Sequence, residues 1–134
     1  TYAAADAPDG DAFAALVAAL ERAQLALIDG IRPGLDYVAL HEAAHRAVAA
    51  ILSEHALVTC SPEAAFDTGI TRAFLPHGLG HLIGLQTHDV GGLQAEPTGR
   101  LRPPPAIYPA LRLTRTVEPD QVFTIEPGLY FIPM

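Results

Sequence analysis

Helical periodicity is confined to the first part of this chain and ends near residue 54. Residues 12–29 combine good helix formers with apolar side chains spaced for one helical face. Gly30 and the pair Pro33-Gly34 end this segment, and Asp36 is a suitable N-cap for a second helix that extends to about Glu54. The turn between the two helices is short, so we expect them to pack as neighbours. The apolar faces of the two expected helices consist of Phe13, Leu16, Val17, Leu20, Leu27 and Ile28 in the first, and of Leu40, Ala44, Ala47, Val48 and Ile51 in the second.

The sequence beyond Cys60 is rich in turn-forming residues and in short β-prone segments. Residues 67–92 predict turns with short strands, and residues 100–109 predict a loop because three consecutive prolines can donate no ladder hydrogen bonds. Residues 111–116, 122–125 and 129–132 predict strands. Helices followed by strands indicate an α+β fold in which two helices pack on one face of a mainly antiparallel sheet.

Composition narrows the range of functions. A length of 134 residues suits one domain, half of the residues are hydrophobic, and the formal net charge is -7 with eight cationic side chains, all of them Arg. This acidic balance argues against nucleic acid or an anionic membrane as the partner. The most apolar stretch, residues 12–28, contains Glu21 and Arg22, which argues against a transmembrane helix. A single cysteine, Cys60, makes the reducing cytoplasm the expected compartment.

The segment His41-Glu42-Ala43-Ala44-His45 matches the zinc-peptidase helix pattern HExxH. Two histidines one turn apart can bind one Zn²⁺ while the glutamate activates water, and Glu63 is the nearest downstream carboxylate for a third ligand. The alternative is that both histidines lie at the rim of the apolar helix face and Glu42 faces solvent. The pattern fixes only three positions, so we favour this packing interpretation.

Two further segments combine chemically active side chains with residues that shape the backbone. Residues 76–89 hold His77, His81 and His88 among three glycines, a density that helices avoid and that suits close approach of the backbone to a neighbour or ligand. Glu126 lies in an apolar strand immediately before Pro127-Gly128. A carboxylate in such a strand either faces solvent or is buried with a cation as its partner, and the following Pro-Gly pair favours a positioned residue.

Taken together, the run from His77 to His81, the pair His88-Asp89 and the segment 124–130 resemble the core motifs of the pita-bread metallopeptidases (creatinase/aminopeptidase-like fold). The similarity is greatest to the bacterial Xaa-Pro dipeptidases, or prolidases, and the motifs occur in that family's order. The resemblance is rich in motifs over residues 71–134 and extends more weakly over the two preceding helices. It implies metal-dependent hydrolysis of dipeptides that end in proline.

The resemblance also implies roles for individual residues. His81 and Glu126 match metal ligands, and Glu126 also matches a residue that shuttles protons. His88 matches the histidine that stabilises the oxyanion at the scissile carbonyl, and His77 resembles a second histidine of the catalytic cleft. Arg112 matches an arginine that binds the free carboxylate of the dipeptide. The implied cofactor is a pair of divalent metal ions, Mn²⁺ first, with Co²⁺ or Zn²⁺ as alternatives.

The family holds its two ions with two Asp, one His and two Glu. The two Asp would lie upstream of Thr1 and the second Glu downstream of Met134, so we expect residues 1–134 to be part of a single C-terminal catalytic domain, inactive alone. The resemblance further implies a homodimeric parent protein with an additional N-terminal domain. Three alternatives remain at this point: an aminopeptidase P-type Xaa-Pro aminopeptidase, the HExxH zinc peptidase, and a non-catalytic binding protein with the same fold.

Overall fold

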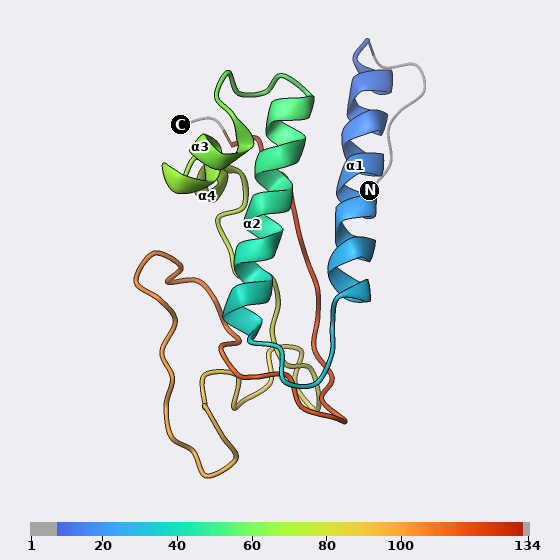
Figure 1. The fold of residues 1–134 in the computed structure, drawn as a ribbon. Helices are drawn as coiled ribbons and strands as arrows, with labels where there is room; N and C mark the ends of the chain where they lie inside the picture. The colour runs from blue at the N-terminus through green and yellow to red at the C-terminus, as the bar shows by residue number, and fades with distance from the viewer. Residues whose placement is uncertain (1–7, 133–134) are drawn as a thin grey trace.

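The computed structural model describes residues 8–132, and its two long helices confirm the helical prediction. Helix α1 spans Gly10–Asp29 and helix α2 spans Tyr37–Glu54, and the two lie side by side (Figure 1). The Asp36 carboxylate accepts a hydrogen bond from the Val38 amide, as expected of an N-cap. Asp9 occupies the N-cap position of α1 but makes no side-chain hydrogen bond there.

Two short helices replace part of the region for which we predicted only turns and strands. Helix α3 spans Pro62–Asp67 and helix α4 spans Thr71–Phe74, and both lie beside the C-terminal end of α2 (Figure 1). Helix α3 begins with a standard signal, because the Ser61 hydroxyl accepts a hydrogen bond from the Ala64 amide and proline occupies the first turn. The prediction over residues 67–92 is therefore wrong at α4 and correct for the irregular segment that follows it.

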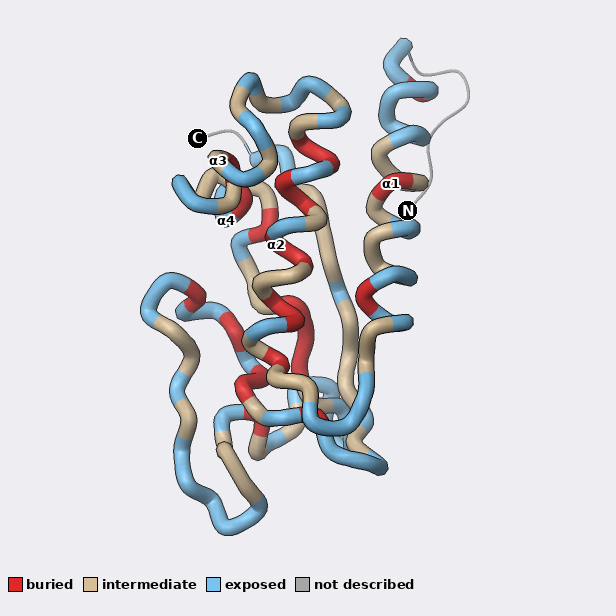
Figure 2. Tube along the Cα trace, in the orientation of Figure 1, coloured by how far each residue is buried: buried red, intermediate tan, exposed pale blue. Residues whose placement is uncertain are grey.

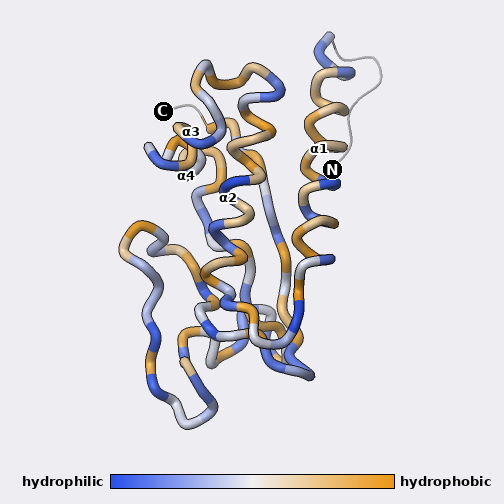
Figure 3. Tube along the Cα trace, in the orientation of Figure 1, coloured by the Kyte–Doolittle hydropathy of each residue, from blue (hydrophilic) through white to orange (hydrophobic). Residues whose placement is uncertain are grey.

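The core lies between α2 and the extended segments beyond α4. Buried residues recur along α2 (Figure 2), and hydrophobic residues recur along the same helix (Figure 3), although the buried His41 and His45 are hydrophilic. Leu40, Ala44, Val48 and Ile51 are buried as predicted, whereas Ala47 is only half-buried. The extended segments contribute Leu75, Leu79, Tyr108, Leu111, Leu113 and Val117 to the core.

The three predicted strands do not form a regular sheet in the described part of the chain. Antiparallel pairing is limited there to isolated bridges: Asp36 with Thr116, Leu82 with Phe123, and Gln94 with Leu101. Backbone hydrogen bonds join residues 122–126 to residues 79–83, and side-chain hydroxyls add to them. The His81 amide donates to the Thr124 hydroxyl at 3.1 Å, and the Thr124 carbonyl accepts from the Tyr37 hydroxyl at 2.8 Å. A local pattern of β-prone residues does not specify these partners, which are distant in sequence.

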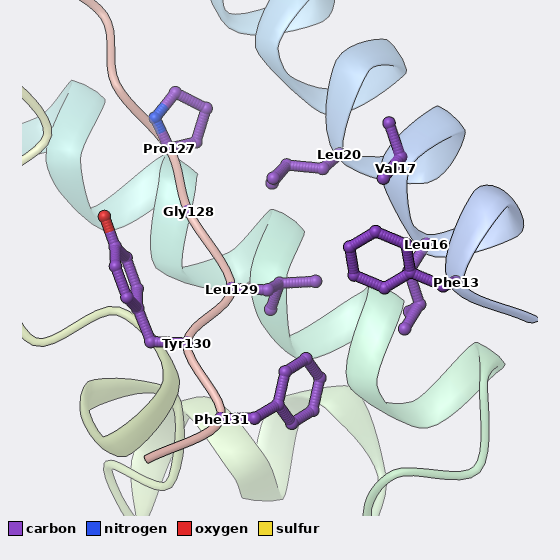
Figure 4. Close-up of a pocket in the computed structure, with 9 residues that line it drawn as sticks. All are labelled: Phe13, Leu16, Val17, Leu20, Pro127, Gly128, Leu129, Tyr130 and Phe131. Carbon is purple, nitrogen blue, oxygen red and sulfur yellow. The ribbon is translucent and has the colours of Figure 1, made fainter. Parts of the chain in front are cut away.

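The first half of helix α1 faces the C-terminal segment, whereas Leu27 near its other end joins the main core. Figure 4 shows Phe13, Leu16, Val17 and Leu20 turned toward residues 127–131 across an apolar cavity of about 270 Å³. Leu129 and Phe131 point toward α1, while Tyr130 points to the opposite side of the segment. Side chains of an extended backbone alternate between two sides, so this segment contacts α1 with Leu129 and Phe131 and presents Tyr130 on its other side.

No helix within residues 8–132 has the length and apolarity needed to cross a membrane.

Candidate active site

His81 and Glu126 are brought together by the pairing of two extended segments. The Ile83 amide donates to the Val122 carbonyl, the Thr124 amide to the His81 carbonyl and the Glu126 amide to the Leu79 carbonyl, at 2.7–3.1 Å. In this register Thr124 lies opposite His81, and Glu126 is two residues further along the same face. Diagonal neighbours of this kind are within reach of long side chains.

Gly80 permits this pairing because a side chain at position 80 has no room. A Cβ there would meet the Thr124 carbonyl, and the Tyr37 hydroxyl would lie 2.6 Å away. Tyr37 is fully buried, and its hydroxyl bridges α2 to the Thr124 carbonyl. Burial, with a smaller effect of the Glu126 carboxylate, raises the pKa of the Tyr37 phenol above its ordinary value, so this hydroxyl remains a donor.

His81 Nε2 lies 3.0 Å from Glu126 Oε1. The other ring nitrogen, Nδ1, lies 2.9 Å from the Leu82 carbonyl, which can only accept, so Nδ1 carries the hydrogen. Nε2 is then the ring atom that faces the carboxylate oxygen, and either a proton on Nε2 or a bound cation can join these two atoms. Metal-binding histidines commonly donate their other ring hydrogen to a backbone carbonyl in this way.

The exposure of the His81 and Glu126 side chains also suits the binding of a metal ion. The His81 side chain is 9% exposed, whereas the Glu126 side chain is 48% exposed and borders an open cavity. The imidazole is thus fixed by the protein, and the carboxylate has room for a bound ion. Imidazole and carboxylate together suit Mn²⁺, Co²⁺ and Zn²⁺.

The cavity beside this pair is lined by every other residue to which the family resemblance assigned a role. It measures about 260 Å³ and is lined by His77, Gly78, Gly80, His81, His88, Ala110, Arg112, Glu126 and Tyr130. The rings of His81 and His88 meet edge to face, with centroids 4.3 Å apart. Arg112 makes no ion pair with any residue in the range 8–132, so its guanidinium is available to an anionic ligand.

His77 is held by two hydrogen bonds. Its Nδ1 donates to the Gly78 carbonyl at 2.8 Å, so Nε2 accepts from the Tyr130 hydroxyl at 2.9 Å. Gly78 is required here because a Cβ would lie 2.8 Å from Leu111 Cα, on the segment that leads to Arg112. The sequence analysis assigned no role to Tyr130, Tyr37 or Thr124. Alternation along 126–130 could have indicated that Tyr130 faces the same side as Glu126, but no sequence pattern indicates the partners of the other two.

The HExxH histidines have a different environment. His41 and His45 are each 1% exposed, and both pack against Tyr108, whose ring stacks on His45 at 5.0 Å between centroids. His45 Nδ1 lies 3.0 Å from the Thr71 hydroxyl. Burial lowers the pKa of His41 to about 3, with smaller effects of His45 and His77, and burial lowers the pKa of His45 to about 4, with a smaller effect of Arg72.

The zinc site predicted as an alternative does not form in the described structure. Glu63, its expected third ligand, is exposed at the start of α3, and no three His, Cys, Asp or Glu side chains within residues 8–132 converge to hold a metal. The two histidines are packing residues, as the alternative interpretation expected, although they lie inside the core rather than at its rim. Glu42 is half-buried, not fully open to solvent.

An imidazole and a carboxylate thus meet on paired segments, beside a cavity that Arg112 also lines. The chain belongs to metallopeptidase family M24, whose model matches residues 1–134. It is 55% identical to the Xaa-Pro dipeptidase of Xanthomonas axonopodis pv. citri over 135 residues, which cover all of this chain and 30% of that protein. It is 54% identical to Xaa-Pro dipeptidase 1 of Idiomarina loihiensis, over 87% of this chain and 26% of that protein.

Solved structures agree with this assignment. The structure of Pseudomonas aeruginosa aminopeptidase PepP superposes with a TM-score of 0.70 and 28% identity, over 95% of this chain and 25% of that one. Proline aminopeptidase P II from Yersinia pestis gives a TM-score of 0.63 and 29% identity, over 90% of this chain and 25% of that one. The chain thus spans about 30% or less of the length of these relatives.

Proposed function

We propose that this chain supplies part of the active site of an Xaa-Pro dipeptidase, a metal-dependent hydrolase of dipeptides ending in proline. The observation that carries the proposal is the pair formed by His81 Nε2 and Glu126 Oε1 at 3.0 Å, with the tautomer of His81 fixed by the Leu82 carbonyl. The names of the relatives that are 54–55% identical support the substrate class.

His81 and Glu126 would hold one or both of two divalent ions, Mn²⁺ in the first place and Co²⁺ or Zn²⁺ as alternatives. When bound, such a pair of ions supplies a hydroxide nucleophile at neutral pH and polarises the carbonyl under attack. Glu126, with an exposed carboxylate, would also accept and return a proton during the reaction. The remaining ligands, two Asp and one Glu, would come from other parts of a longer protein.

The other residues of the cavity would orient the substrate. His88 would donate a hydrogen bond to the developing oxyanion, and the position of its ring against His81 supports this role. His77, held by Tyr130, would form a further wall of the cleft. Arg112 would bind the free carboxylate of the dipeptide and so fix the distance between this end and the scissile bond.

We also propose that residues 1–134 belong to a single C-terminal catalytic domain of pita-bread fold, in which the extended segments join a mainly antiparallel sheet. The superposition on two aminopeptidases supports this architecture. A homodimeric, cytoplasmic parent protein completes the proposal, and the lone thiol Cys60 is consistent with a reducing compartment.

Substrate length tests the proposal. The intact protein should hydrolyse Ala-Pro with a higher kcat/KM than Ala-Pro-Ala, because Arg112 recognises a carboxylate one residue beyond the scissile bond. A preference for the tripeptide would overturn the dipeptidase assignment.

The second candidate function is that of an aminopeptidase P-type enzyme, which the names of the two similar solved proteins favour. An aminopeptidase P-type enzyme should hydrolyse Ala-Pro-Ala with a higher kcat/KM than Ala-Pro. A non-catalytic binding protein of the same fold is the third candidate, and hydrolysis of either peptide would exclude it.

A further inference from the structure

The loop that presents His88 is closed by a contact between Asp89 and Gly84. Residues 83–88 are exposed, yet the Asp89 amide donates to the Leu82 carbonyl at 3.0 Å and the Gly84 amide donates to the Gln86 carbonyl at 3.2 Å. Asp89 is half-buried, and its Oδ1 accepts from the Val90 amide at 2.8 Å. The loop therefore has a fixed base although its tip faces solvent.

Gly84 provides the space for this closure. A Cβ at position 84 would collide with Asp89 Oδ2, so the carboxylate occupies the volume that a side chain would need. Asp89 makes no ion pair with another residue between 8 and 132. The packing of this carboxylate on Gly84, rather than an ion pair, brings the Asp89 side chain against the other end of the loop, and the hydrogen bond from the adjacent Val90 amide orients it.

The Leu82 carbonyl connects this loop to the candidate metal ligand. It accepts two hydrogen bonds, one from His81 Nδ1 at 2.9 Å and one from the Asp89 amide at 3.0 Å. A carbonyl oxygen has two lone pairs, so both bonds form together. The orientation of the His81 imidazole and the start of the segment after His88 therefore depend on the same atom.

We propose that Asp89 is a positioning residue, which packs on Gly84 and thereby holds His88 edge to face with His81. The proposal extends the function proposed above, since it names the residue that keeps the oxyanion-binding histidine beside the metal ligand. A loop this exposed has few other contacts to fix it, and an error of about 1 Å in a catalytic group costs about a hundredfold in rate.

The test compares Asp89→Ala with the conservative Asp89→Asn, which retains the shape and the acceptor for the Val90 amide. In isotope-labelled protein, the nuclear Overhauser effect between the His81 and His88 rings should be lost in Asp89→Ala and retained in Asp89→Asn. Gly84→Ala should weaken it, because the new methyl group displaces the carboxylate. Gly30→Ala is the matched control, since Gly30 has ordinary helical dihedral angles and its nearest neighbour would lie at 3.4 Å.

In the intact peptidase, Asp89→Ala should lower kcat about tenfold to a hundredfold while KM for Ala-Pro and metal content change less than threefold. Asp89→Asn should remain within about threefold of the wild type. An equal loss in both variants would contradict the proposal, because the charge would then matter rather than the shape. Retention of the ring contact in Asp89→Ala would also contradict it. If the wild type fails to cleave Ala-Pro while the ring contacts change as expected, the proposed function fails and the positioning role stands.

Discussion

The chain contains two pairs of histidines with nearly the same mutual geometry and opposite surroundings. His41 and His45 meet edge to face with centroids 4.6 Å apart, and His81 and His88 meet edge to face at 4.3 Å. The first pair is buried beside Tyr108, without a carboxylate bonded to either ring in the described structure. The second borders an open cavity, and Glu126 lies 3.0 Å from His81.

The comparison shows that the environment of a histidine pair decides its chemistry more than its spacing does. The pair with the better-known spacing, one helical turn apart, has depressed pKa values and packs as core. The candidate ligands, His81 and Glu126, are separated by 45 positions and meet only because two extended segments pair. Each prediction below changes one side of this comparison.

The largest effect is expected from Glu126→Gln in the intact peptidase. The substitution keeps the size of the side chain but removes the negative charge that a cation requires. We expect kcat to fall about a thousandfold, equivalent to ~4 kcal/mol, together with loss of bound metal. Glu42→Gln is the matched control in the HExxH segment and should leave both quantities unchanged. A reversal of the two results would identify the helix as the catalytic site.

His41→Ala should act on stability instead of chemistry. Removing a fully buried ring leaves a cavity beside His45 and Tyr108, and we expect the free energy of unfolding to fall by about 3 kcal/mol. Urea denaturation measures the loss, and the folded fraction should retain its metal content and its kcat. Loss of metal in this variant would show that the buried pair is a ligand pair after all.

The buried pair should also make stability depend on pH. The pKa values of about 3 for His41 and about 4 for His45 lie below the ordinary value of 6.5, so below pH 6.5 the unfolded chain binds protons that the folded chain does not. Stability is therefore greatest above pH 6.5 and falls as the pH decreases toward 4. Each histidine should contribute about 2 kcal/mol of this loss between pH 7 and pH 5.

Urea midpoints at pH 7 and pH 5 measure this dependence. The double substitution His41→Phe with His45→Phe should reduce the difference between the two midpoints. An equal difference in the wild type and the double variant would assign the acid sensitivity to other groups.

The smallest effect is expected from Tyr37→Phe, which removes only the hydrogen bond to the Thr124 carbonyl. The carbonyl would lose a buried partner, and the free energy of unfolding should fall by about 1 kcal/mol. Thermal unfolding measures the change, and metal affinity should fall by less than threefold. A loss of affinity as large as that of Glu126→Gln would give Tyr37 a direct role at the site.

The helices could be predicted well from the sequence because their signals are local. Asp36 caps α2 as expected, and the apolar positions Leu40, Ala44 and Val48 form the buried face. Helix α3 also has a local signal, a serine followed by proline and glutamate, which the sequence analysis passed over. The strands could not be predicted in the same way, since both the backbone pairing with residues 79–83 and the added bonds of the Thr124 and Tyr37 hydroxyls join positions that are distant in sequence.

The site could be predicted only through its resemblance to known motifs. Nothing in the composition around His81 and Glu126 specifies the register that joins them, which depends on Gly80 and on the Leu79 and His81 carbonyls. The same physical reason explains why Tyr130 was missed, because its partner His77 lies 53 positions away. Local sequence patterns indicated the candidate side chains, but only the pairing of two distant segments brings His81 and Glu126 into contact.

Manganese binding observed at individual histidines tests the central claim most directly. Protein with ¹⁵N-labelled histidine should be titrated with Mn²⁺, whose unpaired electrons broaden nearby resonances. The account predicts that the ring signals of His81 and His88 broaden first, while those of His41 and His45 remain sharp at the same metal concentration, and that Glu126→Gln abolishes the difference. Preferential broadening of His41 and His45 would contradict the account.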